Sequence, residues 1–393
     1  RVHLIESSDH PGVRVASDYI DGFILDRGFQ LINARYPELQ RLNIMNEIQF
    51  TQAERAVEIA LNNQVAVIGD PRSKLFASLS KETGSISEKL GFIRYLTSSS
   101  RDEFTVEDEL APLGNLYKRV LKPFLSGVFL IDPAQVGAVS GKEIIRSFIS
   151  GQPGLPTRGV GELAKRLASG ISHITYQRSV DSLAEFAQNP VIVATDVTTA
   201  AQLLDMPSVP KLAGSITWYH EVPIDLTTST LLRVDGLQRG PVINSIAISQ
   251  LVPSYAPRGR VLLSSTTIDS ASESEVRRHL ATMWQSSTSE WSLIAKYEIP
   301  SALPLAAVGS RLINTCRIAP GRYVAGDWRE SPSQNGALKS GRRAAQSGGP
   351  SGNPGGPARA RRGEGPRADR RGDRKSTRLN SSHMSESRMP SSA

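Results

Sequence analysis

The chain has 393 residues, of which 39% are hydrophobic, and this length and composition predict two domains with a substantial core. Its single cysteine, Cys316, excludes an internal disulfide and a cysteine zinc cluster, and its six histidines show no metal-ligand spacing. No apolar run approaches the ~20 residues that a membrane span needs. We therefore expect no metal site and a cytoplasmic location, with an organellar or membrane-peripheral location as the alternative.

The net charge of +8 is concentrated at the C-terminal end. Residues 346–393 carry ten Lys and Arg against four Asp and Glu, a net of +6, which leaves +2 for the rest of the chain. The same segment is rich in Gly, Pro, Ser and Arg and has no apolar period. We predict that residues 347–393 are a disordered tail, either native or translated adapter sequence. The body has no basic excess that favours nucleic acid, so an RNA- or phosphate-binding role stays open for the tail only.

The chain opens with a predicted strand, residues 2–5, that ends at Glu6. Dinucleotide folds place an acidic residue at such a strand end, ~20 residues after a glycine fingerprint, where it binds ribose hydroxyls. No G-x-G-x-x-G precedes Glu6 in this sequence. We expect a first strand and its phosphate-binding turn to be missing from the sequence, and the chain as given to bind a dinucleotide cofactor weakly or not at all.

Two glycine-containing segments follow. In residues 8–15, SDHPGVRV, Gly12 precedes Arg14, whose guanidinium group suits a phosphate contact. Val13 would be strained if its position required a positive φ. Residues 21–30, DGFILDRGFQ, alternate apolar side chains up to Gly28 and Phe29 and predict a strand pair bent at its glycines. A hairpin that binds nothing would show the same pattern.

The middle of the chain mixes helices and strands. Residues 51–54 fit a helix start, and Ser272 and Glu275 form a capping box before an apolar helical face. Apart from that helix, residues 206–313 read as strands. This stretch predicts an antiparallel sheet covered by one helix.

Three stretches each allow two interpretations. Residues 122–130 either pack in the core or wall a tunnel for an apolar substrate. Residues 218–220, Trp-Tyr-His, either pack in the core or line a cavity. Residues 159–164 match G-x-G-x-x-A, but a Gly/Pro-rich loop precedes them in place of a strand, so we discount them as a dinucleotide fingerprint.

Residues 156–205 return to an α/β pattern. We predict a helix over residues 161–170 and a continuous buried strand over 190–196. A helix follows that last strand.

A strand–glycine–turn–helix unit comes next, at residues 321–345. The apolar residues 323–325 fit a buried parallel strand, which ends at Gly326 and Asp327. After a turn, Gly336 and Ala337 open a helix rich in small residues. Free N–H groups and the positive end of the helix dipole favour a ligand at such a helix start, although an α/β unit without a ligand shows the same pattern.

Together these segments resemble the superfamily of flavin amine oxidases, phytoene desaturases and protoporphyrinogen oxidases. Residues 321–345 resemble its C-terminal FAD motif, and residues 8–30 resemble its Gly-Gly-Arg loop and its Gly-Phe-Gln segment. The resemblance implies FAD as cofactor, with contacts from Glu6, Gly12, Arg14, Gly28, Phe29, Val180, Gly326, Asp327, Gly336 and Ala337.

The resemblance also implies an α/β fold with two domains. Residues 1–33, 156–205 and 314–346 would form a discontinuous Rossmann-like FAD-binding domain, incomplete at its N-terminus. Residues 34–155 and 206–313 would form an α+β substrate domain with a mostly antiparallel sheet. Glu6 and Asp327 would then follow strands of one parallel sheet.

The implied function is that of an FAD-dependent oxidoreductase that transfers hydride from a small hydrophobic or amine substrate to the flavin. No catalytic residue is named, because the flavin carries the redox chemistry in such enzymes. A non-catalytic flavin-fold binding module and a truncated, inactive fragment are the alternatives. The electron acceptor and the oligomeric state stay open.

Overall fold

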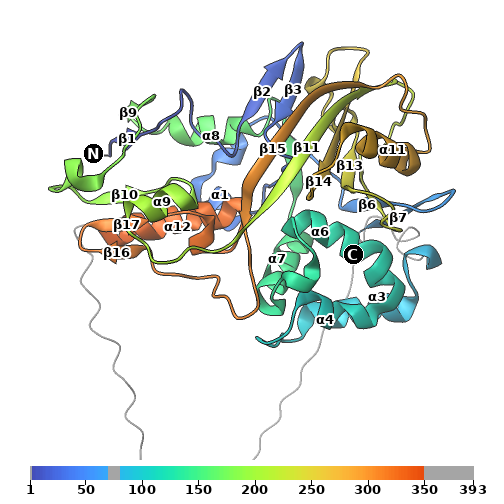
Figure 1. The fold of residues 1–393 in the computed structure, drawn as a ribbon, viewed down its shortest axis with the longest axis horizontal. Coiled ribbons are helices and arrows are strands. Elements are labelled where there is room, and N and C mark those ends of the chain that lie inside the picture. Colours follow the sequence, from blue (N-terminus) through green and yellow to red (C-terminus); the bar gives the residue numbers. More distant parts are fainter. Residues whose placement is uncertain (1, 70–79, 349–393) are drawn as a thin grey trace, which may run out of the picture. The chain divides into compact units, whose positions relative to one another are not determined.

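The structure is a computed structural model that describes residues 2–69 and 80–348 (Figure 1). The predicted disordered tail spans residues 347–393. Of these, only residues 347 and 348 are among the described ones. The largest element is a seven-stranded sheet in the order β15–β11–β14–β13–β12–β6–β7. Its neighbours are antiparallel except for β12 and β6. The strands are β6 (Ala56–Ala60), β7 (Val65–Gly69), β11 (Leu212–Val222), β12 (Leu232–Asp235), β13 (Val242–Ile246), β14 (Val261–Thr267) and β15 (Ser292–Pro304).

The two faces of this sheet carry separate cores. On β11, Trp218 joins the cluster under helix α11 (Glu273–Trp284), whereas its neighbour Tyr219 joins the cluster on the other face. Successive strand residues point to opposite faces, so the aromatic pair at 218–219 packs into both cores. The capping box of Ser272 and Glu275 is present at the start of α11, which confirms that prediction.

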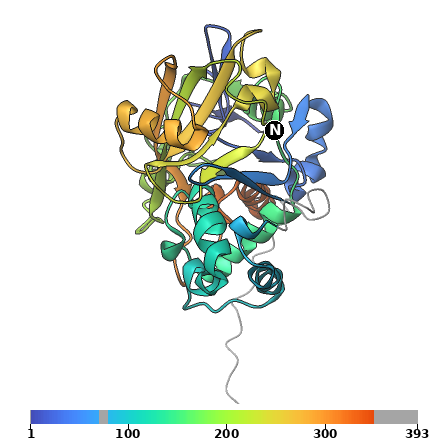
Figure 2. The same ribbon diagram turned by 90° about the vertical axis from the view of Figure 1, so that its right-hand side faces the viewer.

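A group of helices from residues 81–150 packs near β6, β12 and β13 (Figures 1 and 2). Its core joins Tyr117 and Leu121 to Ile59 and Val234 of the sheet. The α-helices are α3 (Ile86–Thr97), α4 (Val106–Leu110), α5 (Gly114–Leu116), α6 (Lys122–Phe129) and α7 (Ala138–Ser150). The short 3₁₀ or π turns are η2 (Lys81–Thr83), η3 (Ala111–Leu113), η4 (Tyr117–Leu121) and η5 (Pro133–Gln135).

Smaller sheets make up the rest. β1 (Leu4–Ile5) pairs in parallel with β9 (Ile174–Thr175), and β10 (Val191–Val193) pairs in parallel with β17 (Arg322–Val324), beside which β16 (Arg317–Ala319) runs antiparallel. A hairpin of β2 (Ser17–Ile20) and β3 (Phe23–Asp26), and a sheet of β4 (Ile32–Asn33), β8 (Pro153–Pro156) and β5 (Phe50–Gln52), complete the strands. The remaining helices and turns are α1 (Pro37–Leu42), η1 (Ile44–Glu47), α8 (Gly161–Ala168), η6 (Leu183–Phe186), α9 (Val197–Leu203), α10 (Ile248–Leu251), η7 (Pro253–Tyr255), η8 (Asp327–Arg329) and α12 (Gln334–Gly348).

Three predictions need correction. Residues 51–54 do not start a helix, because residues 50–52 pair with β8 instead. The strand predicted to be buried over 190–196 is β10, in which Ile192 is 41% exposed. Glu6 and Asp327 do not follow strands of one parallel sheet, since β1 and β17 belong to different sheets.

Within residues 2–69 and 80–348, no helix has the length and apolar character needed to cross a membrane. The same residues contain no cluster of three or more His, Cys, Asp or Glu side chains that could hold a metal ion.

Candidate functional site

The strand–turn–helix unit at β17 and α12 forms as predicted and is closely packed. Tyr323, Val324 and Ala325 are buried, so the apolar run supplies a core strand. The amide of Gly326 then donates to Ser340 Oγ at 2.8 Å, which ties the strand end to the middle of α12. Ser333 caps the helix start by accepting from the amide of Gly336 through its Oγ at 3.1 Å.

Two glycines of this unit are required by protein contacts. A Cβ at Gly336 would lie 1.9 Å from the carbonyl oxygen of Ser331, and one at Gly326 would lie 2.4 Å from Trp328 Nε1. Neither position leaves room for a larger residue. The turn therefore depends on both glycines, and a contact of either with a cofactor remains a prediction.

A bidentate ion pair joins the two ends of the described chain. Arg14 donates through Nη2 to Asp327 Oδ2 at 2.9 Å and through Nη1 to Oδ1 at 3.3 Å. The Asp327 side chain is 9% exposed and that of Arg14 is 44% exposed, so the pair lies at the edge of the core with the cation facing out. Arg14 Nη2 also donates to the carbonyl oxygen of Ala302, at the end of β15.

Two glutamines extend this pair. Gln30 Nε2 donates to the carbonyl oxygen of Arg14 at 2.7 Å, and Gln334 Nε2 donates to Gln30 Oε1 at 3.2 Å. Arg14, Gln30, Asp327 and Gln334, which we call the Arg14 cluster, thus link three segments at the start of α12. Gln334 Oε1 is buried and has no hydrogen-bond partner among the described residues. An acceptor in this state can take an N–H donor from a ligand.

The segments beside the Arg14 cluster adopt the turns expected of their glycines. Gly12 has φ +81° and Gly28 has φ +90°, in the region that favours glycine. A Cβ at Gly12 would lie 2.2 Å from Ala164 Cβ, on α8. Val13 is not among the described residues with a positive φ, so the strain considered for it does not arise. The amide of Phe29 donates to Thr217 Oγ1 at 3.3 Å, which fixes this segment to β11.

No hydrogen bond among the described residues joins Glu6 or Val180 to the Arg14 cluster. Glu6 follows β1, and its Oε1 accepts from the amide of Ser8 at 2.8 Å and from Ser8 Oγ at 2.9 Å. Its own amide donates to the carbonyl oxygen of Thr175 at 2.9 Å, which extends the β1–β9 ladder. Val180 lies beyond β9 outside any strand, and neither residue's predicted cofactor role is tested by these contacts.

Asp26 forms a buried network that the sequence did not reveal. The residue is 1% exposed, and it accepts from Ser17 Oγ at 2.6 Å, from the amide of Val160 at 3.0 Å and from Tyr255 Oη at 2.8 Å. Its carbonyl oxygen accepts from Tyr219 Oη at 2.9 Å. Burial raises the pKa of Asp26 to about 6, although these hydrogen bonds act in the opposite direction. The network joins β3 to β2, β11, η7 and the N-cap of α8.

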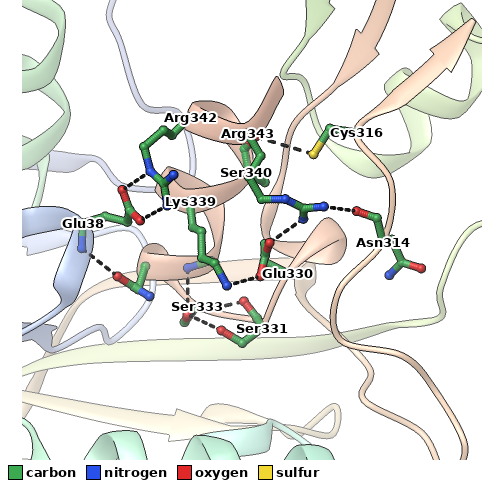
Figure 3. A network of polar contacts seen from close by, with 12 residues as sticks. Glu38, Asn314, Cys316, Glu330, Ser331, Ser333, Lys339, Ser340, Arg342 and Arg343 are labelled. Carbon is green, nitrogen blue, oxygen red and sulfur yellow. Dashed lines mark hydrogen bonds and ion pairs between the residues drawn. The ribbon is translucent and has the colours of Figure 1, made fainter. Parts of the chain in front are cut away.

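Ion pairs hold α12 in place (Figure 3). Arg342 donates to both carboxylate oxygens of Glu38 on α1, at 2.7 and 2.9 Å. Glu330 is 4% exposed and pairs with Lys339 at 2.9 Å and with Arg343. These contacts fix the helix whose start carries Gln334.

The stretch 218–220 is packed in the core and does not line one cavity. Trp218 and His220 point toward α11, and Tyr219 points toward Asp26. His220 has no exposed surface, and neither ring nitrogen has a hydrogen-bond partner among the described residues. Burial lowers its pKa to about 4.

The Arg14 cluster fits a flavin nucleotide in its chemistry. It combines a partly exposed guanidinium, a free amide acceptor and the N-terminal end of a 15-residue helix. Such a set can bind phosphate, hydroxyl and ring N–H groups.

Comparison with known proteins also relates the chain to flavin-containing enzymes. The model of the family described as flavin containing amine oxidoreductase matches residues 1–202. No curated protein sequence matches the chain.

Three solved structures illustrate the shared fold. An oxidoreductase from Methanosarcina mazei superposes with TM-score 0.68 at 15% identity, over 88% of this chain and 94% of that one. A candidate protoporphyrinogen oxidase from Exiguobacterium sp. 255-15 gives 0.64 at 17% identity, over 88% and 92%. Cyclohexylamine oxidase from Brevibacterium oxydans gives 0.59 at 15% identity, over 87% and 92%. At these identities the likeness is one of fold.

Proposed function

The chain belongs to the family of flavin-containing amine oxidoreductases, and on this premise we propose that it is an FAD-dependent oxidoreductase acting on a hydrophobic or amine substrate. The observation that carries the proposal is the Arg14 cluster. It joins a cation from the N-terminal part of the chain to Asp327 and to the start of α12, 313 residues later. Cofactor sites lie preferentially where separate parts of a fold meet, and the Arg14 cluster is such a place.

Several residues of this chain would hold the cofactor. Arg14 would offer its exposed guanidinium edge to a phosphate, while Asp327 keeps the side chain in place. Gln334 would accept from a ring N–H, and the N-terminal turn of α12 would favour partial negative charge. Gly28 and Phe29 would contact the cofactor, and the buried Asp26 network would help to exclude water from that side.

The flavin, when bound, supplies the redox chemistry by accepting two electrons and a proton equivalent from the substrate. The chain's part is to bind, to orient and to keep water out. Asp26 is no candidate for a general base, because it is buried and its carboxylate already accepts three hydrogen bonds. The proposal therefore assigns no proton transfer to a side chain.

One experiment distinguishes an oxidoreductase from a non-catalytic flavin-binding module. The full chain is loaded with FAD, and the visible absorbance of the flavin is followed under anaerobic conditions while amines such as cyclohexylamine, or apolar desaturase and porphyrinogen substrates, are added. Bleaching by one class supports an oxidoreductase and names its substrate class. Retained flavin that none of them bleaches would favour a non-catalytic flavin-binding module. Because the chain as given is expected to bind the cofactor weakly or not at all, FAD is kept in excess, and loss of FAD on washing does not count against the proposal.

A further inference from the structure

A pocket of about 310 Å³ lies beside the turn that follows β17. It is lined by residues from three segments, 208–210, 304–314 and 328–332. None of the ten residues predicted to contact FAD lines it. Its lining combines apolar residues, among them Leu305, Leu312 and Trp328, with polar ones, among them Ser208, Ser310 and Asn314.

Two arginines line this pocket, the exposed Arg311 and the buried Arg329, and neither forms an ion pair with a described carboxylate. Arg329 is 8% exposed, yet among residues 2–69 and 80–348 no carboxylate forms an ion pair with it. Its Nη2 donates to the carbonyl oxygen of Thr315, and the guanidinium lies 4.8 Å from the centre of the Trp328 ring. Its Nε is buried and makes no hydrogen bond to a described residue. Burial lowers the pKa of this guanidinium, which nonetheless stays charged at neutral pH.

The nearest acidic residue does not compensate for this charge. Glu330 also lines the pocket, but its two carboxylate oxygens pair with Lys339 and Arg343 (Figure 3). A buried cation without a counter-ion is costly, and an anion that enters the pocket would remove the cost. A guanidinium group offers N–H donors that match a carboxylate, and use of the buried Nε–H would require the Arg329 side chain to shift toward the pocket.

We propose that this pocket binds an organic monocarboxylate, with its carboxylate on Arg329 and its apolar body against the apolar lining residues. Of the two lining arginines only Arg329 is buried, and the neighbouring Glu330 carboxylate disfavours the second negative charge of a phosphate. The apolar lining residues favour a ligand with a hydrocarbon or aromatic body. This site is separate from the Arg14 cluster and does not depend on the proposed redox function.

Benzoate tests this proposal in the full chain. Binding is measured by calorimetry and by the fluorescence of Trp328, one of four tryptophans in the sequence. We expect saturable binding of benzoate, with benzamide, acetate and inorganic phosphate each weaker by about tenfold or more, since benzamide lacks the charge and the other two lack the apolar body. Benzamide binding as tightly as benzoate would overturn the proposal.

Two variants locate the site. Arg329→Met should weaken benzoate binding by about tenfold or more while leaving the melting temperature in the absence of ligand unchanged or raised. Arg322→Met is the matched control, because Arg322 likewise binds only carbonyl oxygens and lies outside the pocket. Arg322→Met should bind benzoate like the wild type. Equal binding by wild type and Arg329→Met would overturn the proposal.

Two further measurements keep the test decisive. If Arg329→Met fails to fold, Arg329→Lys keeps the charge but loses the planar fork, and should retain weakened binding. Unchanged affinity in that variant would count against a carboxylate held by the guanidinium edge. FAD should not displace benzoate; displacement would place benzoate in the cofactor site and overturn a separate pocket. Benzoate binding is measured without flavin, so failure of the FAD proposal would leave this result unaffected.

Discussion

Arg14 and Asp327 form a bidentate ion pair across 313 residues of sequence, with N–O distances of 2.9 and 3.3 Å. The pair connects a loop near the N-terminus to the turn before α12, and Gln30 and Gln334 extend it by hydrogen bonds. Both charged residues lie in segments that resemble the family's cofactor motifs, and their contact with a cofactor is a prediction. Arg14 and Asp327 can therefore each act in two ways: by fixing the partner in the ion pair, and by contacting a ligand directly.

The first prediction separates these roles. Relative to the wild-type chain, which is itself expected to bind FAD weakly, Asp327→Ala should raise the FAD dissociation constant about tenfold or more, since a hydrogen bond to a charged group contributes about 1.5–3 kcal/mol. Arg14→Gln should have a similar effect, and the double variant should be little worse than either single one, because the pair acts as a unit. The measurement is the FAD dissociation constant from quenching of flavin fluorescence.

The matched control for this prediction is Arg260→Gln. Arg260 forms a similar bidentate pair with Glu221, and its side chain is 37% exposed. It lies outside the Arg14 cluster, so FAD binding should not change. Fully additive losses in the Arg14 and Asp327 variants would show that the two residues contact the cofactor independently.

The second prediction concerns the turn before α12. A Cβ at Gly336 would lie 1.9 Å from the Ser331 carbonyl oxygen, so Gly336→Ala should destabilise the fold by about 1–3 kcal/mol through overpacking. At Gly341 of the same helix, a Cβ would meet no atom within 4 Å, and Gly341→Ala should stabilise by up to about 1 kcal/mol. Urea unfolding of both variants measures the difference. Equal stabilities would mean that the turn shifts freely to admit a side chain.

Local patterns predicted the elements that local interactions determine. The strand and turn at 323–337 and the capping box at Ser272 are set by residues close in sequence, and both are found. Residues 51–54 also carry a local helix signal, but pairing with β8, about a hundred residues away, decides that Phe50–Gln52 is a strand. Sequence alone contains no information on that register.

In the candidate site too, the sequence predicts single residues but not the contacts between distant segments. The motifs gave Arg14 and Asp327 singly, but their ion pair depends on how distant segments meet. Asp26 was missed as a buried network, although one signal was present: it ends an apolar run, Phe23-Ile24-Leu25, whose members are all buried. A carboxylate in that position needs donors, and those come from α8, β2 and η7, which no local pattern connects.

The third prediction uses the Asp26 carboxyl. Its pKa is about 6 in the folded protein and near 4 when unfolded. Between these values the folded state holds a proton that the unfolded state has released, so stability falls as pH rises from about 4 to 6 and is constant above. The full loss is on the order of 3 kcal/mol. Asp26→Asn cannot titrate and should lack this loss, as urea unfolding at pH 4.5 and 7 would show. A variant with the same pH dependence as the wild type would contradict the assignment.

The fourth prediction has the opposite sign and concerns His220. Its pKa is about 4 in the folded protein, because burial disfavours the charged ring, against about 6.5 when unfolded. Between these values the unfolded state binds the extra proton, so stability falls as pH drops from about 6.5 to 4. His220→Phe keeps an aromatic ring beside Trp291 and removes both the titration and two buried nitrogens that lack hydrogen bonds.

The His220→Phe variant should therefore be at least as stable as the wild type at pH 7, and more stable by about 1–3 kcal/mol near pH 5. The Asp26 and His220 titrations oppose each other between pH 4 and 6, so the wild-type profile alone reveals neither. The difference between each variant and the wild type isolates one group. A His220→Phe protein that loses stability at both pH values would show that the ring nitrogens have partners in solution, and that His220 holds β11 and α11 together through them.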